Sequence, residues 1–337
     1  MRRWIRPLLG LAVTVFFTWL MLNRVEFAEV GAALSRISVV SLAMALAFLA
    51  ADYAIRIVRW WWMLRALDPR VALGACGWPF LVSIAVNNLV PFRVGDALRV
   101  VGFHKELKVP AMSVLGTLFV ERLLDLMTLL AFFFWGLSGI NDGTVPSTLI
   151  RLASWIAAGS VLAVLAVLLL SRQIERVVNF VADRPFLIAR GWSSPIKRHS
   201  NNFLETLRLL LTPALTLRLI GLSIVVWMLE GGVFAIVAHT LSPESTASAP
   251  WFAMATGTLA TLIPSSPGYV GTFDYFTVLG LKAYGAQPSA AAAFAFTVHA
   301  VLWLPLTVTG VVYFLRPGAA LLRRQAAAVI SSEKESV

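Results

Sequence analysis

The sequence predicts an all-α polytopic membrane protein, and three observations lead to this fold class. Hydrophobic residues make up 59% of the 337 residues and charged residues only 13%. Apolar runs of about 20 residues recur along the chain, which is the helix length needed to cross roughly 30 Å of hydrocarbon. The net charge of +11 comes from Lys and Arg that fall mostly between these runs, as the positive-inside rule expects.

Six apolar runs are long enough to span a membrane. They cover residues 7–23, 39–58, 111–135, 150–171, 216–240 and 289–315. The first has the basic head of a signal peptide, but no small-x-small cleavage site follows closely, so we interpret it as an uncleaved span. We expect one transmembrane domain over residues 1–320 and a disordered cytoplasmic tail over 321–337.

Two further apolar stretches, 78–92 and 250–264, are too short to span and end in turns that contain proline. We expect re-entrant or broken helices here, with return limbs at 94–108 and 268–285. The first break contains NNLVPFRVGDALR, from Asn87 to Arg99, which holds two amides, an aspartate and two arginines. Such polarity is tolerable at membrane depth only if it lines a cavity.

The two breaks share a pattern that predicts an inverted repeat. Segments from Pro91 and Pro267 both open with P-x-x-V-G, and a second proline follows after 19 and 21 residues and begins a span. A tryptophan precedes each break, Trp78 and Trp251. Three predicted spans separate the copies, so halves at about 78–135 and 250–315 would enter from opposite sides. The alternative is a chance match of a common helix break.

Charged residues in the third span are candidates for a midplane cavity. Glu121 lies 11 residues after Pro110, roughly 16 Å along the helix, and Arg122 and Asp125 share its polar stripe. A charge at the bilayer centre costs about 2.5–3.5 kcal/mol, so these side chains should face protein or water. The structural alternative is an Arg122–Asp125 ion pair.

Three further groups extend these candidates. Asp52 and Arg56 are spaced i, i+4, which favours a structural pair. Glu230 and His299 fall inside other spans, and the sequence leaves them open between a structural role and the cavity.

Residues around the first break are candidates for binding a headgroup. Arg93 and Arg99 could hold a phosphate with help from free backbone N–H groups, although arginines near the inner leaflet are also expected from the positive-inside rule. We expect Asp96 to orient an arginine. The full headgroup set is Asn87, Asn88, Arg93, Asp96 and Arg99, and the helix-break set is Pro91, Gly95, Pro264, Pro267, Gly268, Gly271 and Asp274.

Basic residues fix the expected orientation. They gather at the N-terminus, after the second span, and in segment 172–214: Arg2, Arg3, Arg6, Arg56, Arg59, Arg65, Arg70, Arg172, Arg176, Arg184, Arg190, Lys197, Arg198 and Arg208. The loops GLSGINDGTVPST and HTLSPESTASAP contain none, so both termini should be cytoplasmic. Segment 172–214 should form two amphipathic helices on the anionic inner leaflet, or else bind a partner protein.

The motifs N-N-L-V-P-x-R-x-G-D-x-x-R, E-R-x-x-D and I-P-x-x-P-G-x-x-G-x-x-D resemble the lysylphosphatidylglycerol synthase transmembrane-region family, or flippase-like domain family. The resemblance covers roughly residues 5–320, with Asp96 and Asp274 where the family often has glutamate. It implies movement of aminoacylated phosphatidylglycerol between leaflets, as in the membrane domain of multiple peptide resistance factors. Stand-alone relatives are associated with hopanoid biosynthesis or labelled glycosyl-lipid synthases, so the substrate stays open.

The sequence therefore favours a membrane lipid translocator in the bacterial cytoplasmic membrane that works without a cofactor. The single Cys76, the absence of Cys/His clusters, and the absence of a P-loop argue against metal, redox and nucleotide chemistry. We expect no separate synthase domain and hence no stand-alone aminoacyl-lipid synthesis. The alternatives are a membrane transferase, for which the outer loops offer only Asp142, Glu244 and His239, and a non-transporting partner of lipid-modifying enzymes.

The expected partners are membrane lipids and the anionic inner leaflet, with a second copy of the chain as a further candidate and no nucleic acid. Glu121→Gln and Arg93→Ala should abolish transport while leaving expression nearly intact. Aggregation of both variants would instead indicate a structural ion pair.

Overall fold

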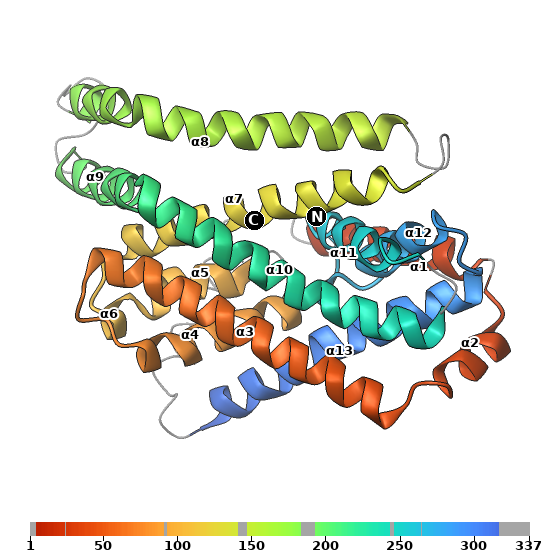
Figure 1. Cartoon of the computed structure of the whole chain (residues 1–337). Coiled ribbons are helices and arrows are strands. Elements are labelled where there is room, and N and C mark those ends of the chain that lie inside the picture. The colour runs from red at the N-terminus through yellow and green to blue at the C-terminus, as the bar shows by residue number, and fades with distance from the viewer. Residues whose placement is uncertain are drawn as a thin grey trace.

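The computed structural model describes residues 5–23, 25–90, 93–140, 147–182, 193–242, 246–263 and 265–316, and these residues form helices and no strands. The predicted tail, Pro91 and Pro264 lie outside the described residues. Figure 1 shows the arrangement. The elements are α1 (Ile5–Leu22), α2 (Phe27–Leu34), α3 (Val39–Leu67), α4 (Leu73–Leu89), α5 (Val94–Gly102), α6 (His104–Leu107), α7 (Ala111–Leu137), α8 (Ser147–Ala182), α9 (Ser193–Leu210), α10 (Pro213–Leu241), α11 (Ala249–Ala260), η3 (Pro267–Tyr269), α12 (Thr272–Lys282) and α13 (Pro288–Leu315).

Among the described residues, three helices, α3, α10 and α13, are long and apolar enough to cross a membrane, and the bent pair of α1 and α2 adds a fourth if it is counted as one span. Large apolar side chains on the outside agree with a lipid surround, since Val39 is 83% exposed and Leu217 is 72% exposed. Helix α7 is 27 residues long but carries Glu121, Arg122 and Asp125 near its middle. The protein is therefore an all-helical membrane protein.

Two helices extend beyond the spans predicted for them, 39–58 and 150–171. Helix α3 continues from residue 58 to Leu67, because Trp60, Met63 and Leu64 are fully buried and keep the helix packed. Helix α8 continues to Ala182, so the first part of segment 172–214 belongs to α8 and not to a separate amphipathic helix. The second part forms α9, which packs on α7 and α8.

Two breaks interrupt the chain close to their predicted positions. Helix α4 ends at Leu89 and α5 begins at Val94, where Arg93 has the left-handed φ of 56°. Helix α11 ends at Ala260 and α12 begins at Thr272, with positive φ at Gly268, Tyr269 and Gly271 between them. Pro110 caps α7 and Pro288 begins α13, as the paired prolines predicted.

The helix was expected to restart after Gly95, but α5 begins at Val94, so Gly95 lies just inside it. It lies in the first turn of α5, where α5 crosses α4, and a Cβ on Gly95 would overlap the carbonyl oxygen of Ser83. Glycine is needed there for close approach of two backbones. The turn itself is made by the residues before it, including Arg93.

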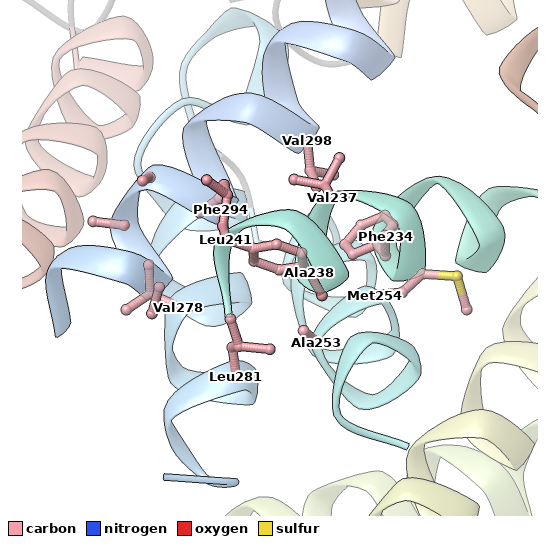
Figure 2. Close-up of a cluster of buried hydrophobic side chains, with 14 of the residues drawn as sticks. Phe234, Val237, Ala238, Leu241, Ala253, Met254, Val278, Leu281, Phe294 and Val298 are labelled. Atoms are coloured by element: carbon pink, nitrogen blue, oxygen red, sulfur yellow. The ribbon is translucent and has the colours of Figure 1, made fainter. Parts of the chain in front are cut away.

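The largest apolar cluster lies between α10, α11, α12 and α13 (Figure 2). Phe234 of α10 and Phe294 of α13 pack edge to face, with ring centroids 5.9 Å apart. Beside them, Ala291, Ala292, Ala293 and Ala295 are fully buried. Lipid tails are as apolar as these side chains, so close van der Waals packing through small residues holds the helices together.

Candidate functional site

The site begins with two arginines of α3 that lie inside the helix bundle. Arg56 and Arg59 are both buried, because α3 continues beyond them to Leu67. Their assignment to a basic loop after the second span was therefore wrong. Helix α3 packs along α10, so both arginines face acidic or polar side chains of neighbouring helices.

Arg56 binds two carboxylates. Its Nε donates to Asp52 over 2.8 Å, which confirms the predicted i, i+4 pair, and its Nη2 donates to Glu230 of α10 over 2.6 Å. The guanidinium also lies 4.8 Å from the ring centre of Trp227. One guanidinium therefore serves two buried carboxyl groups, one on α3 and one on α10.

Arg59 binds Asp125 of α7. Its Nη1 and Nη2 reach the two carboxylate oxygens over 2.6 and 3.2 Å, and Nη1 also donates to the Ser223 hydroxyl over 2.7 Å. The indole N–H of Trp227 donates to Asp125 over 3.2 Å. A bidentate, charge-assisted contact of this kind fixes the three helices α3, α7 and α10 relative to one another.

Arg99 of α5 is enclosed with Glu121 of α7. The guanidinium donates to both carboxylate oxygens over 3.2 and 3.3 Å, and the residues are 0% and 2% exposed. The rings of Trp60 and Phe80 cover Arg99, with centres 5.1 and 4.9 Å from its Cζ. Neither charge is available to an incoming ligand in this arrangement.

Asp96 accepts from Arg122 and Asn87. Both of its carboxylate oxygens lie 3.1 Å from Nη2 of Arg122, and Asn87 Nδ2 donates to it over 3.0 Å. Asn87 Oδ1 in turn accepts the backbone N–H of Asp96 over 3.2 Å, which satisfies a free donor in the first turn of α5. Asp96 thus orients an arginine as expected, and that arginine is Arg122, which lies 4.0 Å from Asp125.

Arg93 ties the two breaks together. Its Nε donates to the Tyr269 hydroxyl over 3.1 Å and its Nη2 to the Thr261 hydroxyl over 3.2 Å. The end of α4 also contacts η3 in the second break. Asn88 links α4 to α13, because its backbone carbonyl accepts the indole N–H of Trp303 over 3.3 Å. The two breaks, which are far apart in sequence, therefore lie side by side.

Asp274 and His299 form a third polar unit. One carboxylate oxygen of Asp274 accepts the backbone N–H of Gly271 over 2.9 Å, and the other lies 2.7 Å from Nδ1 of His299. A carboxylate only accepts, so Nδ1 carries the proton and Nε2 of a neutral His299 is an acceptor. The contact fixes the direction in which the imidazole faces.

A cavity of about 150 Å³ lies where the second break meets α3, α4, α10 and α13. Glu230 and His299 bring ionisable groups to its wall. The complete lining is Tyr53, Asn88, Glu230, Thr258, Thr261, Gly268, Tyr269, Phe273, His299, Leu302 and Trp303.

Only some of the predicted site residues line this cavity. Asn88, Glu230, Gly268 and His299 line it. The described candidates outside the lining are Asn87, Arg93, Gly95, Asp96, Arg99, Glu121, Arg122, Asp125, Pro267, Gly271 and Asp274. Of these, Arg93 and Asp274 are bonded directly to the lining residues Tyr269 and His299.

Sequence reasoning missed the aromatic part of the lining. Tyr53 and Trp303 lie in apolar stretches, where an aromatic residue carries no signal of its own. Tyr269 and Phe273 lie within the second break, where only the Pro, Gly and Asp residues carry a signal. The position of Arg59 could have been predicted from its spacing. It lies three residues after Arg56, which places both on the same face of a helix.

Comparison with known proteins finds similarity over most of the chain. A glycosyltransferase AglD of Haloferax volcanii is 26% identical over 321 residues, which cover 87% of this chain and 51% of that protein. A UPF0104 membrane protein, MJ1078 of Methanocaldococcus jannaschii, is 22% identical over 231 residues, which cover 68% of this chain and 92% of that protein. The chain therefore spans about half the length of the first relative and nearly all of the second.

The family described as the lysylphosphatidylglycerol synthase TM region matches residues 8–310, which include both breaks and every residue that lines the cavity. The match agrees with the motifs around Asn87, Glu121 and Asp274, and with the helical membrane fold. The chain belongs to the lysylphosphatidylglycerol synthase TM region family.

Proposed function

We propose that this protein is a lipid translocator, which moves a polar or anionic lipid between the leaflets of the cytoplasmic membrane. Candidate lipids are a phospholipid, an aminoacyl-phospholipid, and a hopanoid or isoprenoid lipid. In this proposal the protein does not itself synthesise an aminoacyl lipid. Movement is downhill or coupled to an ion or proton, since the sequence contains no P-loop.

The observation that carries the proposal is the cavity where the second break meets α3, α4, α10 and α13. Its wall combines Glu230, His299 and Asn88 with aromatic side chains, among helices whose outer surfaces are apolar. Polar side chains and irregular backbone at membrane depth are typical of substrate pathways, because elsewhere they would face hydrocarbon at a high cost. A polar headgroup that crosses the membrane needs a polar binding site within the hydrocarbon region.

An inverted repeat within six spans is part of this proposal, and reciprocal packing supports it. Helix α4 of the first half packs on α13 of the second, and α11 of the second packs on α7 of the first. Trp78 stacks on Tyr313 with ring centroids 4.5 Å apart, and Trp251 stacks on Phe132 at 5.5 Å. Two halves related by a two-fold axis in the membrane plane would make paired contacts of this kind.

The test is lipid movement in proteoliposomes. Fluorescent phospholipid is reconstituted in both leaflets, and a membrane-impermeant reductant destroys the fluorescence of accessible lipid. We expect the reductant to destroy a larger fraction of the fluorescence in proteoliposomes than in protein-free liposomes. Thr258→Phe, which fills the cavity, should abolish the excess, and Val312→Phe, on the exposed face of α13, should preserve it. A folded protein that moves no lipid while an unrelated scramblase does would overturn the proposal.

A second candidate is a membrane-embedded glycosyl- or lipid-modifying transferase. The name of the Haloferax volcanii relative favours it, although this chain matches only 51% of that protein's length. The discriminating measurement is incubation of the reconstituted protein with labelled nucleotide sugars and polyprenyl phosphate. Labelled lipid product that disappears with Thr258→Phe would support the transferase, and its absence alongside lipid movement would support the translocator.

A further inference from the structure

One buried carboxyl group differs from the others in its hydrogen bonds. The six carboxyl groups that are buried among the described residues belong to Asp52, Asp96, Glu121, Asp125, Glu230 and Asp274. In all but Glu230, both oxygens accept hydrogen bonds from side chains or the backbone. The Oε2 of Glu230 accepts from Arg56, and its Oε1 has no donor among the described residues.

The guanidinium groups around these carboxyl groups are one too few to neutralise them. Those bonded to a buried carboxyl group or to the cavity wall are Arg56, Arg59, Arg93, Arg99 and Arg122. Six carboxylates against five guanidinium groups leave one negative charge while His299 is neutral. Net charge at membrane depth is costly, so this set of side chains favours one bound proton.

The free oxygen of Glu230 faces the cavity. Glu230 is only 8% exposed, yet it lines the cavity, and its Oε1 is not enclosed in the way that the unpaired Thr258 hydroxyl is. The cavity of about 150 Å³ takes several water molecules, each of which needs roughly 10–15 Å³. A proton can therefore reach Oε1 through water.

A proton on Oε1 leaves every observed contact of Glu230 in place. Oε2 is then the carbonyl oxygen, which still accepts from Arg56, and the new O–H donates into the cavity. Arg56 then faces one carboxylate, Asp52, to which its Nε already donates. The ionised and the protonated side chain thus fit the same geometry.

The cavity wall holds a second acceptor for this proton. His299 uses Nδ1 for Asp274, and its Nε2 has no partner among the described residues. A proton on Nε2 makes His299 the ion-pair partner of Asp274, whose other oxygen accepts the backbone N–H of Gly271 in the second break. Tyr53 and Tyr269 add hydroxyls to the wall, and a hydroxyl can both donate and accept.

We propose that Glu230 holds one exchangeable proton on Oε1, that His299 Nε2 is the second position of this proton, and that the proton is coupled to lipid movement. The inference rests on the proposed function, and it names the ion that drives the translocator. Ionised Glu230 holds Arg56 through a charge-assisted bond roughly twice as strong as a neutral one. The proton therefore changes how firmly α10 is held to α3, and both helices line the cavity.

The titratable and charged groups that act on Glu230 come from three neighbouring helices, because α11 carries no charged residue. They are Asp52, Tyr53 and Arg56 of α3, Asp125 of α7 and His299 of α13. None of the carboxyl groups in this set other than Glu230 has a free oxygen, so Glu230 is the one that exchanges a proton with the cavity.

The first experiment detects the proton without any lipid. Infrared spectra of the full chain in detergent micelles follow the C=O stretching band of a protonated carboxyl group, which an ionised carboxylate lacks. A coupling proton exchanges near neutral pH, where ordinary exposed carboxyl groups, which titrate near about pH 4, stay ionised. We expect a band that grows as the pH falls through this range, is lost in Glu230→Gln, and still titrates in Glu230→Asp. Glu29→Gln, on exposed α2, is the control and should keep the band.

The second experiment measures coupling in proteoliposomes with a pH difference across the membrane and the membrane potential clamped. With one proton for each lipid, one pH unit sustains up to about a tenfold difference in fluorescent lipid between the leaflets. Glu230→Gln should abolish this difference, and Glu29→Gln should preserve it.

The outcomes separate the proton from the translocator. A carboxyl band that is absent, that does not change with pH, or that survives in Glu230→Gln would overturn the proton site. Lipid movement that leaves equal leaflets under the pH difference would overturn the coupling and leave the translocator standing. A titrating band that requires Glu230, in a protein that moves no lipid, would remove the translocator and its coupling and keep the proton site.

Discussion

At the scale of single residues, the interior is organised by buried arginines that each face a carboxylate. Arg59 and Arg99 are enclosed, and each faces one carboxylate in a two-point contact, Asp125 and Glu121 respectively. An ion pair of this kind gives little net stability when it is intact, because both charges lose their water. Removal of one partner is expensive, because the other charge remains buried and unpaired.

This asymmetry changes the expectation for Glu121. Glu121→Gln leaves the Arg99 guanidinium buried without a counter-charge, so we expect a loss of about 3–5 kcal/mol in the free energy of unfolding. The measurement is the thermal unfolding midpoint in detergent, with Glu29→Gln as the exposed control. The double variant Glu121→Leu with Arg99→Met, which removes both charges, should recover much of the loss. Unchanged unfolding with abolished lipid movement would return Glu121 to the cavity-lining role that the sequence suggested.

At the scale of helices, the sequence predicted where the chain breaks but not what the breaks touch. Proline, glycine and polar clusters located both breaks, and apolar length located α3, α10 and α13. The end of α3 was misplaced because Arg56 and Arg59 look like loop residues until their acidic partners on α7 and α10 are known. Partners 66 and 174 positions away leave no local signal.

Arg93 makes the contact between the breaks testable. Its left-handed backbone costs roughly 1–2 kcal/mol for a residue with a Cβ, and its bonds to Tyr269 and Thr261 offset this cost. We expect Tyr269→Phe, which removes only the hydroxyl, to speed amide hydrogen exchange in residues 261–271, and Arg93→Ala to speed it further. Tyr313→Phe, at the far end of α13, is the matched control. Equal exchange in all three variants would show that the breaks hold their shape without Arg93.

The crossing of α5 and α4 gives a second prediction at this scale. Gly95→Ala places a Cβ against the Ser83 carbonyl, so the two helices must move apart, and we expect a loss of about 1–3 kcal/mol in unfolding free energy. Gly74→Ala lies in the first turn of α4, where an added Cβ meets no atom within 4 Å, and it should be neutral or slightly stabilising. Thermal unfolding of both variants makes the comparison, and an equal effect would exclude close packing as the role of Gly95.

At the scale of the whole molecule, the apolar exterior and the polar interior are arranged as bilayer physics requires. Exposed Val39, Trp155 and Leu217 face outward, and the carboxylates of Asp52, Glu121 and Asp125 face inward. Arg218 lies over the ring of Trp62 and Arg316 over that of Trp78, with distances of 4.3 and 5.2 Å to the ring centres. Arginine and tryptophan are both typical of a membrane interface, so we expect these contacts to lie at an interface.

The proposed orientation and inverted repeat make one joint prediction. The segments before α4 and before α11 should lie on opposite sides of the membrane, because the two halves enter from opposite faces. In a Cys76→Ser background, single cysteines replace Arg70, which is 87% exposed in its side chain, and Thr246, which is exposed before α11. A membrane-impermeant maleimide should label Thr246→Cys in intact cells and Arg70→Cys only after permeabilisation, because the basic residue belongs on the cytoplasmic side. Labelling of both positions from the same side would exclude the inverted repeat, and the reverse pattern would keep the repeat and invert the orientation.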